Sequence, residues 1–576
     1  MQILDPATGT GTFLSAVIAQ IHAAFADNQG LWSGYVREHL LPRLYGFELL
    51  MAPYTVAHLK LGLLLRDTGY DFAGEDRLRV YLTNTLEQPR ELTHLPLFGD
   101  WLVKEARQAT EVKQQAPIMV VLGNPPYSGH SANQGEWIAE LLRGRDGLNG
   151  RRTGSYFVVD GQPLNERNPK WLNDDYVKFI RFAQWRIEQT GYGILAVITN
   201  HGYLDNPTFR GMRRSLMETF DELYLLDLHG NSKKKEQAPD GGKDENVFDI
   251  QQGVAIGLFI RMGEKAGEKA SCRVHHAELW GERNGKYQWL LEKDIGSTAW
   301  RELEPQAPYY LFIPQDVDLL SEYEQGWKIN EIMPVSVLGF QSHRDPFAID
   351  IERNHLQQRI QNMRDRDLAD REFAELYSLK DNRDWKLPKV REQLRADPNW
   401  QQKILECAYR PFVRRWCYFS EVAMDYPRRE LKQHVANKAN LCLNVVRQTK
   451  AADWRHAVVT DKPAPAVFVE IKDGSSVFPL YLYAGKGDLM DDAETYSAQG
   501  RRANLSPQFI QTCAVNLNLT WLEDGSGDMK TTVGPEDIFH YAYAIFHSPT
   551  YRSRYAAFLK IDFPRLPLTS NQNLFR

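Results

Sequence analysis

The sequence predicts an α/β protein: a mainly parallel sheet with helices on both faces, followed by a separate mixed α/β domain. Short apolar runs alternate with stretches of helical periodicity through the first half of the chain, a pattern typical of such a sheet. After about residue 290 the alternation weakens, and tryptophan and arginine become frequent. We therefore divide the 576 residues into domains at 1–295 and 296–576.

The expected elements of the first domain alternate between strand and helix. Helices are expected at about 12–27 and from about 52, and strands at 44–49, 78–86 and 117–127. The segments 174–199 and 209–228 are each expected to begin as a helix and to end as a strand. The Gly-, Asn- and Arg-rich stretch 128–171 predicts a long surface loop or lid. Residues 253–261 and 271–279 flank a polar linker and predict an antiparallel hairpin at the sheet edge.

The second domain contains a highly charged segment and two aromatic-basic ones. Residues 352–402 predict helices, and such a charged segment is more often a solvated helical face than a binding element. Arginines and aromatic residues are interleaved at 409–419 and 426–434. These two stretches are the candidates for a local basic surface.

Composition excludes several classes of protein. The longest apolar run, 253–260, has eight residues, far below the ~18 of a membrane helix. The N-terminus lacks the pattern of a signal peptide. The five cysteines show no zinc-ligand spacing, so we expect reduced thiols in a cytoplasmic protein and no metal site. A net charge of −5 gives no global sign of nucleic-acid binding.

A glycine motif, DPATGTGTF, begins at Asp5. Gly9 and Gly11 allow a tight turn that approaches a ligand closely. A dinucleotide fingerprint would need a third glycine where Leu14 stands and an acid ~20 residues later, whereas Glu48 comes much further on. Asp5 suits an amino group and Glu48 suits a ribose diol, so the pair favours S-adenosylmethionine (AdoMet). The expected cofactor-binding residues are Asp5, Pro6, Ala7, Thr8, Gly9, Thr10, Gly11, Thr12, Phe13 and Glu48. A purely structural turn is the alternative.

A second motif, NPPY, follows the strand expected at 117–127. Pro125 and Pro126 offer no N–H donors and hold the backbone extended, so carbonyl oxygens point outward beside the Asn124 side-chain oxygen. These acceptors can hold a planar amino group while Tyr127 stacks on its ring. Positioning then supplies most of the catalysis. A merely structural Pro-Pro-aromatic turn is the alternative.

The two motifs together resemble those of the amino-methyltransferases that modify adenine in DNA, in the gamma order with the target recognition domain last. The resemblance implies a Rossmann-like AdoMet-dependent methyltransferase sheet and a flipped target adenine. It also implies that Asn124 and Asn84 contact AdoMet, with Asn84 where the family often has an acid. Phe248 falls where the family places a second aromatic that stacks on the extruded base; a core Phe is the alternative.

Longer stretches resemble the single-polypeptide Type I-like (Type ISP) restriction-modification enzymes over essentially the whole chain. They include PLNERNPKWLNDDYVKFIRFAQW, HGNSKKKEQAPDGGKDENVFDIQQGVAIG, YRPFVRRWCYF and HSPTYRSRYAAFLKIDFPRLPL. The resemblance implies a nuclease and an ATP-dependent translocase upstream, and nothing in this chain matches GxxxxGK[ST]. The family's upstream methyltransferase helix is missing as well. We therefore expect an N-terminally truncated piece.

The resulting hypothesis is a site-specific DNA adenine-N6 methyltransferase module of a bacterial restriction-modification enzyme, acting on double-stranded DNA. Two alternatives remain: a catalytically silent DNA-binding module and a protein glutamine methyltransferase. Sequence reading is expected after about residue 300, and 233–235 are expected in a mobile loop touching the DNA backbone. The candidate DNA-binding residues are Arg410, Arg414, Arg415, Arg428 and Arg429.

Overall fold

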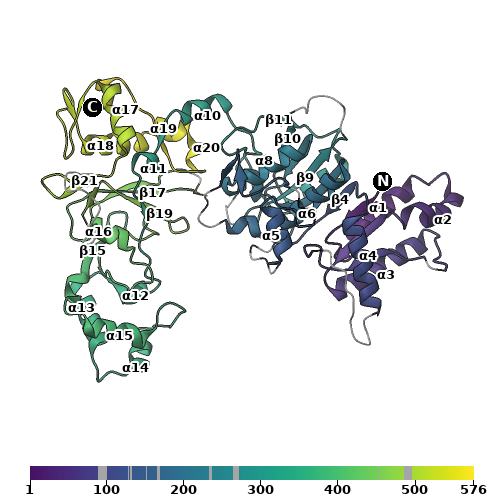
Figure 1. Ribbon diagram of the computed structural model, residues 1–576, viewed down its shortest axis with the longest axis horizontal. Helices are drawn as coiled ribbons and strands as arrows, with labels where there is room; N and C mark the ends of the chain where they lie inside the picture. The colour runs from purple at the N-terminus through teal and green to yellow at the C-terminus, as the bar shows by residue number, and fades with distance from the viewer. Residues whose placement is uncertain are drawn as a thin grey trace. The chain divides into compact units, whose positions relative to one another are not determined.

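The chain's first strand lies inside a large mixed sheet, seen in the computed structural model of the protein (Figure 1). The structure describes residues 1–576 except 75, 89–99, 128, 130, 132, 149, 151, 165, 167–168, 233–235, 264–270, 450, 452 and 485–495. The described residues form two compact units, Met1–Gln315 and Asp316–Arg576. The predicted division after residue 295 comes earlier than this one, because β11 (Arg301–Leu303) still pairs with the first unit's sheet.

The sheet of the first unit has the strand order β11-β10-β8-β9-β7-β4-β1-β2-β3 among the described residues. The strands are β1 (Ile3–Asp5), β2 (Leu44–Glu48), β3 (Arg79–Leu82), β4 (Val120–Gly123), β7 (Gly193–Asn200), β8 (Glu222–Asp227), β9 (Val254–Arg261), β10 (Arg273–Glu278) and β11. The run from β7 to β3 is parallel throughout, and β8 is parallel to β10. The α/β prediction is confirmed.

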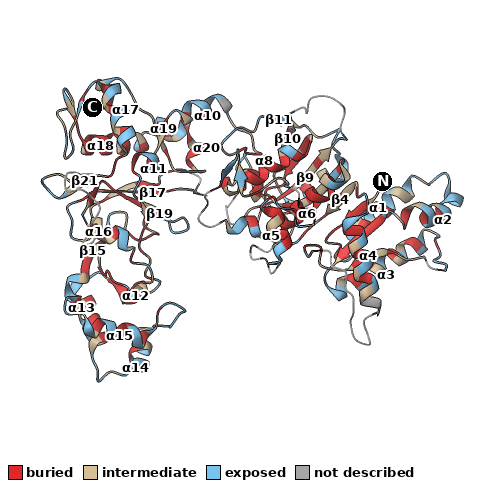
Figure 2. Ribbon diagram, viewed as in Figure 1, coloured by how far each residue is buried: buried red, intermediate tan, exposed pale blue. Residues whose placement is uncertain are grey.

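Successive residues of the central strands enter opposite cores because side chains alternate along a strand. In β1, Ile3 packs in one hydrophobic cluster and Leu4 in the other. Helices α1 (Thr12–Ala23) and α3 (Met51–Asp67) contribute to the Ile3 cluster, whereas α4 (Asp100–Gln114) and α6 (Asp175–Thr190) contribute to the Leu4 cluster. The expected helices on both faces are present (Figure 2).

The predicted hairpin between 253–261 and 271–279 is wrong in its pairing. Strand β9 lies antiparallel between β7 and β8, and β10 pairs with the far edge of β8. The apolar run of β9 can be buried within the sheet because it has a partner on each side. The antiparallel pair at the sheet edge is β10 with β11.

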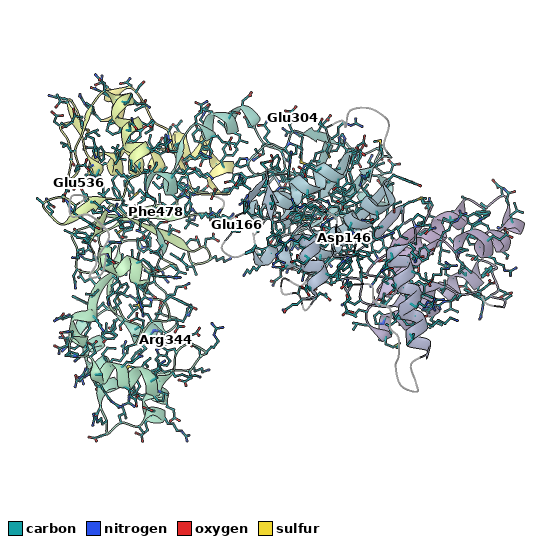
Figure 3. The ribbon with its side chains drawn as sticks, in the orientation of Figure 1. Asp146, Glu166, Glu304, Arg344, Phe478 and Glu536 are labelled. Carbon is teal, nitrogen blue, oxygen red and sulfur yellow. The ribbon has the colours of Figure 1, made fainter. Side chains whose placement is uncertain are left out.

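The predicted loop at 128–171 contains a buried helix, α5 (Glu136–Leu142). Its residues Trp137, Ile138, Leu141 and Leu142 belong to the core, packing with α6. The same stretch holds the short strands β5 (Val158–Val159) and β6 (Gln162–Pro163) and the turn Lys170–Asn173. Asp146, labelled in Figure 3, accepts a hydrogen bond from the buried Trp185 indole, 2.9 Å. The sequence predicted a loop here because glycine-rich composition surrounds these apolar residues.

The remaining helices of the first unit connect these strands. They are α2 (Trp32–Tyr35), the π-helical turn Val36–Leu40, α7 (Gly202–Asp205), α8 (Arg210–Thr219) and α9 (Arg283–Glu292). Helix α6 ends at Thr190, and Gly191 follows as its cap with a φ of 90°, which suits glycine. The segment after β11 is fixed to this unit: Arg213 donates to the Tyr309 carbonyl oxygen, and the Tyr310 hydroxyl donates to Asp160, 2.7 Å.

The second unit is a mixed α/β structure with more than one sheet. One sheet has the order β13 (Val337–Leu338), β19 (Ser475–Pro479), β17 (Cys442–Val446), β18 (Ala457–Thr460), and another the order β14 (Ile349–Asp350), β16 (Val413–Tyr418), β15 (Ile404–Arg410). Short pairs join β12 (Trp327–Lys328) to β24 (Arg565–Leu566), β20 (Tyr481–Tyr483) to β21 (Arg501–Ala503) and β22 (Thr520–Trp521) to β23 (Thr532–Val533).

Helices of the second unit pack on these two sheets. One group of helices packs in the core beside the sheet that contains β17. These helices are α10 (Val317–Glu324), α11 (Ile329–Ile332), α17 (Pro507–Leu517), α18 (Pro535–His547), α19 (Pro549–Arg554), α20 (Ala556–Leu559) and α21 (Gln572–Phe575). A smaller cluster holds α16 (Arg429–Val435). The other core holds α12 (Asp345–Ala348), α13 (Arg353–Arg364), α14 (Asp370–Leu376) and α15 (Leu387–Ala396).

The charged segment 352–402 is helical, as predicted, and it is also well anchored. Leu356, Ile360 and Met363 of α13 are fully buried. The buried Arg391 of α15 donates through Nε to the Met363 carbonyl oxygen, 2.9 Å, and pairs with Asp370 at 2.6 Å. The buried face of this segment therefore forms part of the core of the second unit.

Candidate functional site

The predicted cofactor and catalytic motifs meet at one edge of the sheet. Strand β1 lies between β4 and β2 and is parallel to both, so Asp5, Glu48 and Asn124 all stand at carboxyl ends of adjacent strands. In open α/β sheets this edge is where ligands bind. The structure thus brings together residues that are 119 positions apart in sequence, from Asp5 to Asn124.

The glycine turn is held by two hydrogen bonds to the end of β2. The Gly9 N–H donates to Glu48 Oε2, 2.9 Å, and the Thr8 N–H donates to the Phe47 carbonyl oxygen, 3.0 Å. Gly9 and Gly11 have φ of 55° and 79°, which favours glycine. A Cβ on Gly46 would lie 2.5 Å from Thr8 Oγ1, so β2 approaches the turn too closely for any other residue.

Asp5 is a buried carboxyl with an unused oxygen. Its Oδ1 accepts the Ala7 N–H at 3.1 Å, whereas Oδ2 has no hydrogen-bond partner among the described residues. Burial raises the pKa of Asp5 from 3.8 to about 7; the Ala7 N–H opposes this rise, and the charge of Glu48 adds to it. A Cβ on Gly123 would lie 2.8 Å from Oδ1, so the carboxyl lies against the end of β4. Oδ2 is an acceptor available to a cationic ligand.

Glu48 spans the ends of β1 and β2 with both carboxylate oxygens. Oε2 accepts the Gly9 N–H, and Oε1 accepts the Leu50 N–H at 2.8 Å. The carboxylate is therefore fixed in orientation, and each oxygen keeps a lone pair for a further donor. This is the arrangement that two ribose hydroxyls would need.

The NPPY segment carries the second unused acceptor. Asn124 Oδ1 is buried and has no hydrogen-bond partner among the described residues. Pro125 is buried and Pro126 exposed, directly after β4. Burial raises the pKa of the Tyr127 hydroxyl to about 12, and the Asn124 side chain hydrogen-bonded to it opposes that rise. Asn124 and Tyr127 are therefore side by side, with one acceptor still open.

Asn84 belongs to a polar network that the sequence did not predict. Its Nδ2 donates to Asn133 Oδ1 at 3.1 Å, and its own Oδ1 accepts the Leu86 N–H. Asn133 in turn donates to Asp175 Oδ1, 3.0 Å, at the start of α6. The buried Lys178 donates to Ser131 Oγ, 2.8 Å. This network connects the residues after NPPY to α6. The sequence did not predict these contacts because the residues lie within a glycine-rich stretch.

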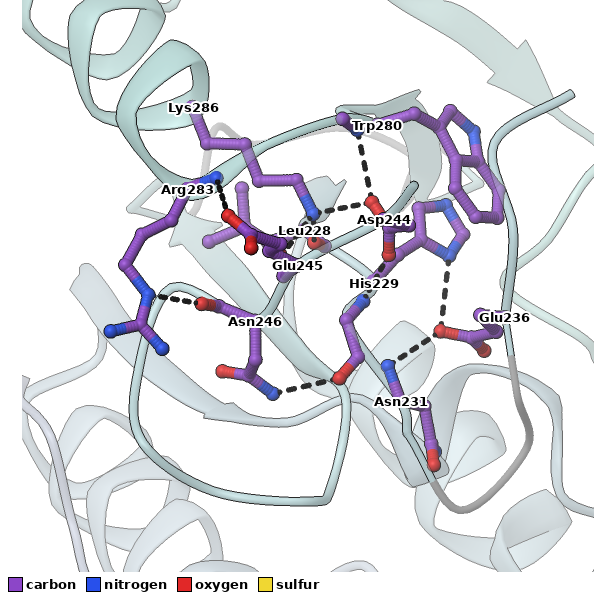
Figure 4. A network of polar contacts seen from close by, with 12 residues as sticks. Leu228, His229, Asn231, Glu236, Asp244, Glu245, Asn246, Trp280, Arg283 and Lys286 are labelled. Carbon is purple, nitrogen blue, oxygen red and sulfur yellow. Dashed lines mark hydrogen bonds and ion pairs between the residues drawn. The ribbon is translucent and has the colours of Figure 1, made fainter. Parts of the chain in front are cut away.

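Phe248 lies in a segment clamped by α9. Arg283 donates through Nε to the Asn246 carbonyl oxygen, 2.7 Å (Figure 4), and through Nη2 to that of Phe248, 3.0 Å. Lys286, fully buried, pairs with Asp244 at 2.7 Å and also donates to the Leu228 carbonyl oxygen. The Phe248 side chain is half-buried and packs against a small apolar cluster, so both of its predicted environments remain compatible with the fold.

The five arginines predicted to contact DNA all have partners within the second unit. Arg410 and Arg415 lie over the ring of Tyr409, at 4.4 and 4.1 Å. Arg414 pairs with Asp461 at 3.0 Å. Arg429 pairs with Glu421 at 2.8 Å, and Arg428 lies 5.2 Å from the ring of Tyr426. Their contact with DNA stays a prediction.

An exposed aromatic residue at the turn between β15 and β16 went unnoticed in the sequence. Phe412 is fully exposed, with φ of 65°, beside the pair of Arg410 with Val413. The sequence feature that could have indicated Phe412 is its position within the aromatic-basic stretch 409–419. The lysines at 233–235 lie outside the described residues.

Comparison with known families places the second unit. Residues 331–576 match the family model of the Type ISP C-terminal specificity domain. The predicted resemblance to Type ISP enzymes is confirmed. The match begins within α11 and extends to the last residue, so the sheets and helices of this specificity domain carry it. No curated protein matches the chain.

Solved structures share the fold over the whole chain. The ATP-dependent Type ISP restriction-modification enzyme LlaBIII bound to DNA has a TM-score of 0.72 at 20% identity, and a DrdV–DNA complex has 0.69 at 21%. A nuclease-deletion mutant of the Type ISP enzyme LlaGI with a DNA substrate mimic has 0.67 at 19%. Each match covers 100% of this chain but 36%, 53% and 43% of LlaBIII, DrdV and LlaGI respectively. The chain thus spans about half the length of these proteins or less.

Among the described helices, none combines the length and apolar character required to cross a bilayer.

Proposed function

We propose that this chain is the methyltransferase and target-recognition portion of a Type ISP restriction-modification enzyme, and that it methylates adenine N6 in double-stranded DNA. The observation that carries the proposal is the buried Asn124 Oδ1, which has no hydrogen-bond partner among the described residues and lies beside Tyr127, at the end of the strand next to Asp5. An open acceptor and an aromatic side chain are the groups that an adenine amino edge and ring require.

AdoMet fits the residues at the neighbouring strand ends. Asp5 Oδ2 is a buried acceptor to which no residue in the described part of the chain donates, and Glu48 is an oriented carboxylate with lone pairs available. Asp5 would hold the ammonium group, Glu48 the ribose hydroxyls and Asn84 the adenine edge. When bound, AdoMet supplies an electrophilic methyl group.

The chain's own residues then act by positioning. Asn124 Oδ1 and the Pro125 carbonyl oxygen accept the two hydrogens of the adenine amino group, which draws its nitrogen lone pair out of conjugation with the ring. Tyr127 stacks on one face of a base taken out of the duplex, and Phe248 lies in the segment proposed to cover the other. The amino nitrogen would form its bond to the methyl carbon as the methyl–sulfur bond of the sulfonium breaks, and the proton that the nitrogen releases would pass to water. No covalent intermediate on the protein is required.

The test is methyl transfer in the intact enzyme, followed as N6-methyladenine in digested target DNA. Asn124→Ala should abolish the product while specific DNA binding persists, because recognition is assigned to the second unit. Asn28→Ala, which changes an exposed asparagine of the same unit, is the control and should leave the rate unchanged. A near-normal rate for Asn124→Ala would exclude the proposed grip on the amino group. An intact wild type that binds DNA but makes no methyladenine would instead favour a silent binding module.

A glutamine side-chain amide as the methyl acceptor is the second candidate, because Asn124 and Tyr127 could also hold a planar amide. The specificity-domain match over 331–576 favours DNA, since such a substrate would not require a unit of this size. Labelled methyl groups recovered in protein rather than in DNA would reverse this choice.

A further inference from the structure

We propose that His201, His229 and Glu236 form a binding site for a divalent transition-metal ion of the zinc class. One donor atom from each residue lies within 4.8 Å of the other two. Two imidazole nitrogens and one carboxylate oxygen are ligands that such ions commonly take. The site stands at the carboxyl ends of β7 and β8, and it does not depend on the proposed methyl transfer.

His201 is already oriented as a metal ligand would be. Its Nδ1 lies 3.0 Å from Asp227 Oδ1, and both residues are buried. Because a carboxylate can only accept, Nδ1 carries the hydrogen, which leaves the Nε2 lone pair for an ion. The ring also has little freedom: a Cβ on Gly253 would lie 2.3 Å from Nε2, so only glycine fits opposite it.

His229 shows the same pattern with its nitrogens exchanged. The ring is buried, and Nε2 has no hydrogen-bond partner among the described residues but faces Glu278 Oε1 at 3.6 Å. Its Nδ1 lies 3.9 Å from Glu236 Oε2 and 3.6 Å from Asp227 Oδ2. Both ring nitrogens thus face carboxylates at more than hydrogen-bond length. Donors of a tetrahedral zinc site are about 3.3 Å apart, so the 3.9 Å between His229 Nδ1 and Glu236 Oε2 has to shorten only slightly when an ion binds.

Asn231 connects two of the three ligands, Glu236 and His201, and offers a fourth donor. Its N–H donates to Glu236 Oε2, 2.9 Å (Figure 4), and its side-chain amide lies 3.1 Å from His201 Nε2. With the amide turned about its last bond, the oxygen would face the same ion. Asn O and N positions are assigned from their surroundings, so either orientation is accessible.

The charge and shape around these residues favour a cation. A cavity of about 360 Å³ is lined by the two histidines and by Asp227, Glu236 and Glu278, with Arg301 also lining it. With Asp205, which also lines the cavity, four carboxylates therefore surround two imidazoles. The ligands come from the end of β7, the end of β8 and the segment that follows, so a bound ion would fasten the start of the connection that carries Phe248.

The test uses the 576-residue chain after chelator treatment and dialysis, titrated with Zn²⁺ by calorimetry and with Co²⁺ by visible absorption. We expect one ion per chain and a tetrahedral Co²⁺ spectrum without a thiolate charge-transfer band. The double variant His229→Gln, Glu236→Gln should bind at least 100-fold more weakly. Glu278→Gln should weaken binding about tenfold, since Glu278 orients His229 from the far nitrogen.

His275→Gln is the matched control, because His275 stacks on Tyr224 at 4.5 Å and does not line the cavity. It should bind Zn²⁺ as the wild type does. Circular dichroism confirms that each variant is folded, and Glu236→Gln alone serves if the double variant is not. Absence of a Zn²⁺ site in the wild type, a Co²⁺–thiolate band, or wild-type affinity in folded Glu236→Gln would each overturn the proposal.

Discussion

Asp5 should make the first unit less stable as the pH rises, and Asp5→Asn should remove that penalty. The carboxyl is fully buried, and burial raises its pKa from 3.8 to about 7. In this case the folded state binds the proton more tightly than the unfolded state does. The stability contribution is therefore complete below pH 3.8 and is lost progressively as the pH rises to about 7.

The magnitude follows from the two pKa values. At about 1.4 kcal/mol for each pH unit, the stability lost through Asp5, relative to low pH, is about 2 kcal/mol at pH 5, where the folded protein keeps the carboxyl protonated, and about 4 kcal/mol at pH 8, where the carboxyl is ionised. Asparagine has nearly the same shape, and its oxygen can still accept the Ala7 N–H. We therefore expect the free energy of unfolding of Asp5→Asn, relative to wild type, to increase by about 3 kcal/mol between pH 5 and pH 8.

The assay is urea unfolding of the wild type and Asp5→Asn at pH 5, 6, 7 and 8 without AdoMet. Asp27→Asn, an exposed carboxyl of the same unit, is the control and should show no such trend. AdoMet should stabilise the wild type and have little effect on Asp5→Asn. A difference between the two proteins that stays constant with pH would refute the account of Asp5 as a buried carboxyl held for a cationic ligand.

Three further perturbations test the site and its support. Gly46→Ala places a Cβ 2.5 Å from Thr8 Oγ1 and should destabilise the unit by about 1–3 kcal/mol in urea, with weaker AdoMet binding by calorimetry; Gly34→Ala, which meets no described atom, should do neither. Lys286→Met leaves the buried Asp244 without its charge partner, with the Gly230 and Gly281 N–H groups still donating to it, at a cost of about 3–5 kcal/mol, whereas Lys243→Met at an exposed pair should cost less; equal losses would contradict this. Replacing 316–576 with the equivalent unit of a relative should transfer the methylated sequence, as sequencing of modified DNA would show; methylation at the original site would place the reader in the first unit.

The local motifs of the cofactor site could be predicted because each is confined to a few consecutive residues. The glycine turn and NPPY need only neighbours in sequence to show their chemistry, and the alternation of strand and helix places both at strand ends. The contact of Gly9 with Glu48 and the closeness of Asp5 to Gly123 could not be predicted as distances, because they depend on the order of strands in the sheet.

The errors arose where pairing is non-local. Sequence proximity favoured a hairpin of β9 with β10, yet β9 pairs with two strands that precede it. Helix α5 was missed because its Trp137 and Leu141 are surrounded by residues typical of loops. The cluster of His201, His229 and Glu236 was also not predicted, since its first two members belong to different strand ends and show no ligand spacing.

The insertion of β9 between β7 and β8 has a consequence for how the chain folds. During synthesis β7 and β8 emerge before β9, but among the described strands β8 joins the rest of the sheet only through β9. The parallel strands from β7 to β3 can assemble first, with β7 as a temporary edge. Until residues 254–261 arrive, two apolar strands have open edges, and such edges invite pairing with other chains. Pairing with β9 covers the edge of β7 and one edge of β8, and the other edge of β8 stays open until β10 is made.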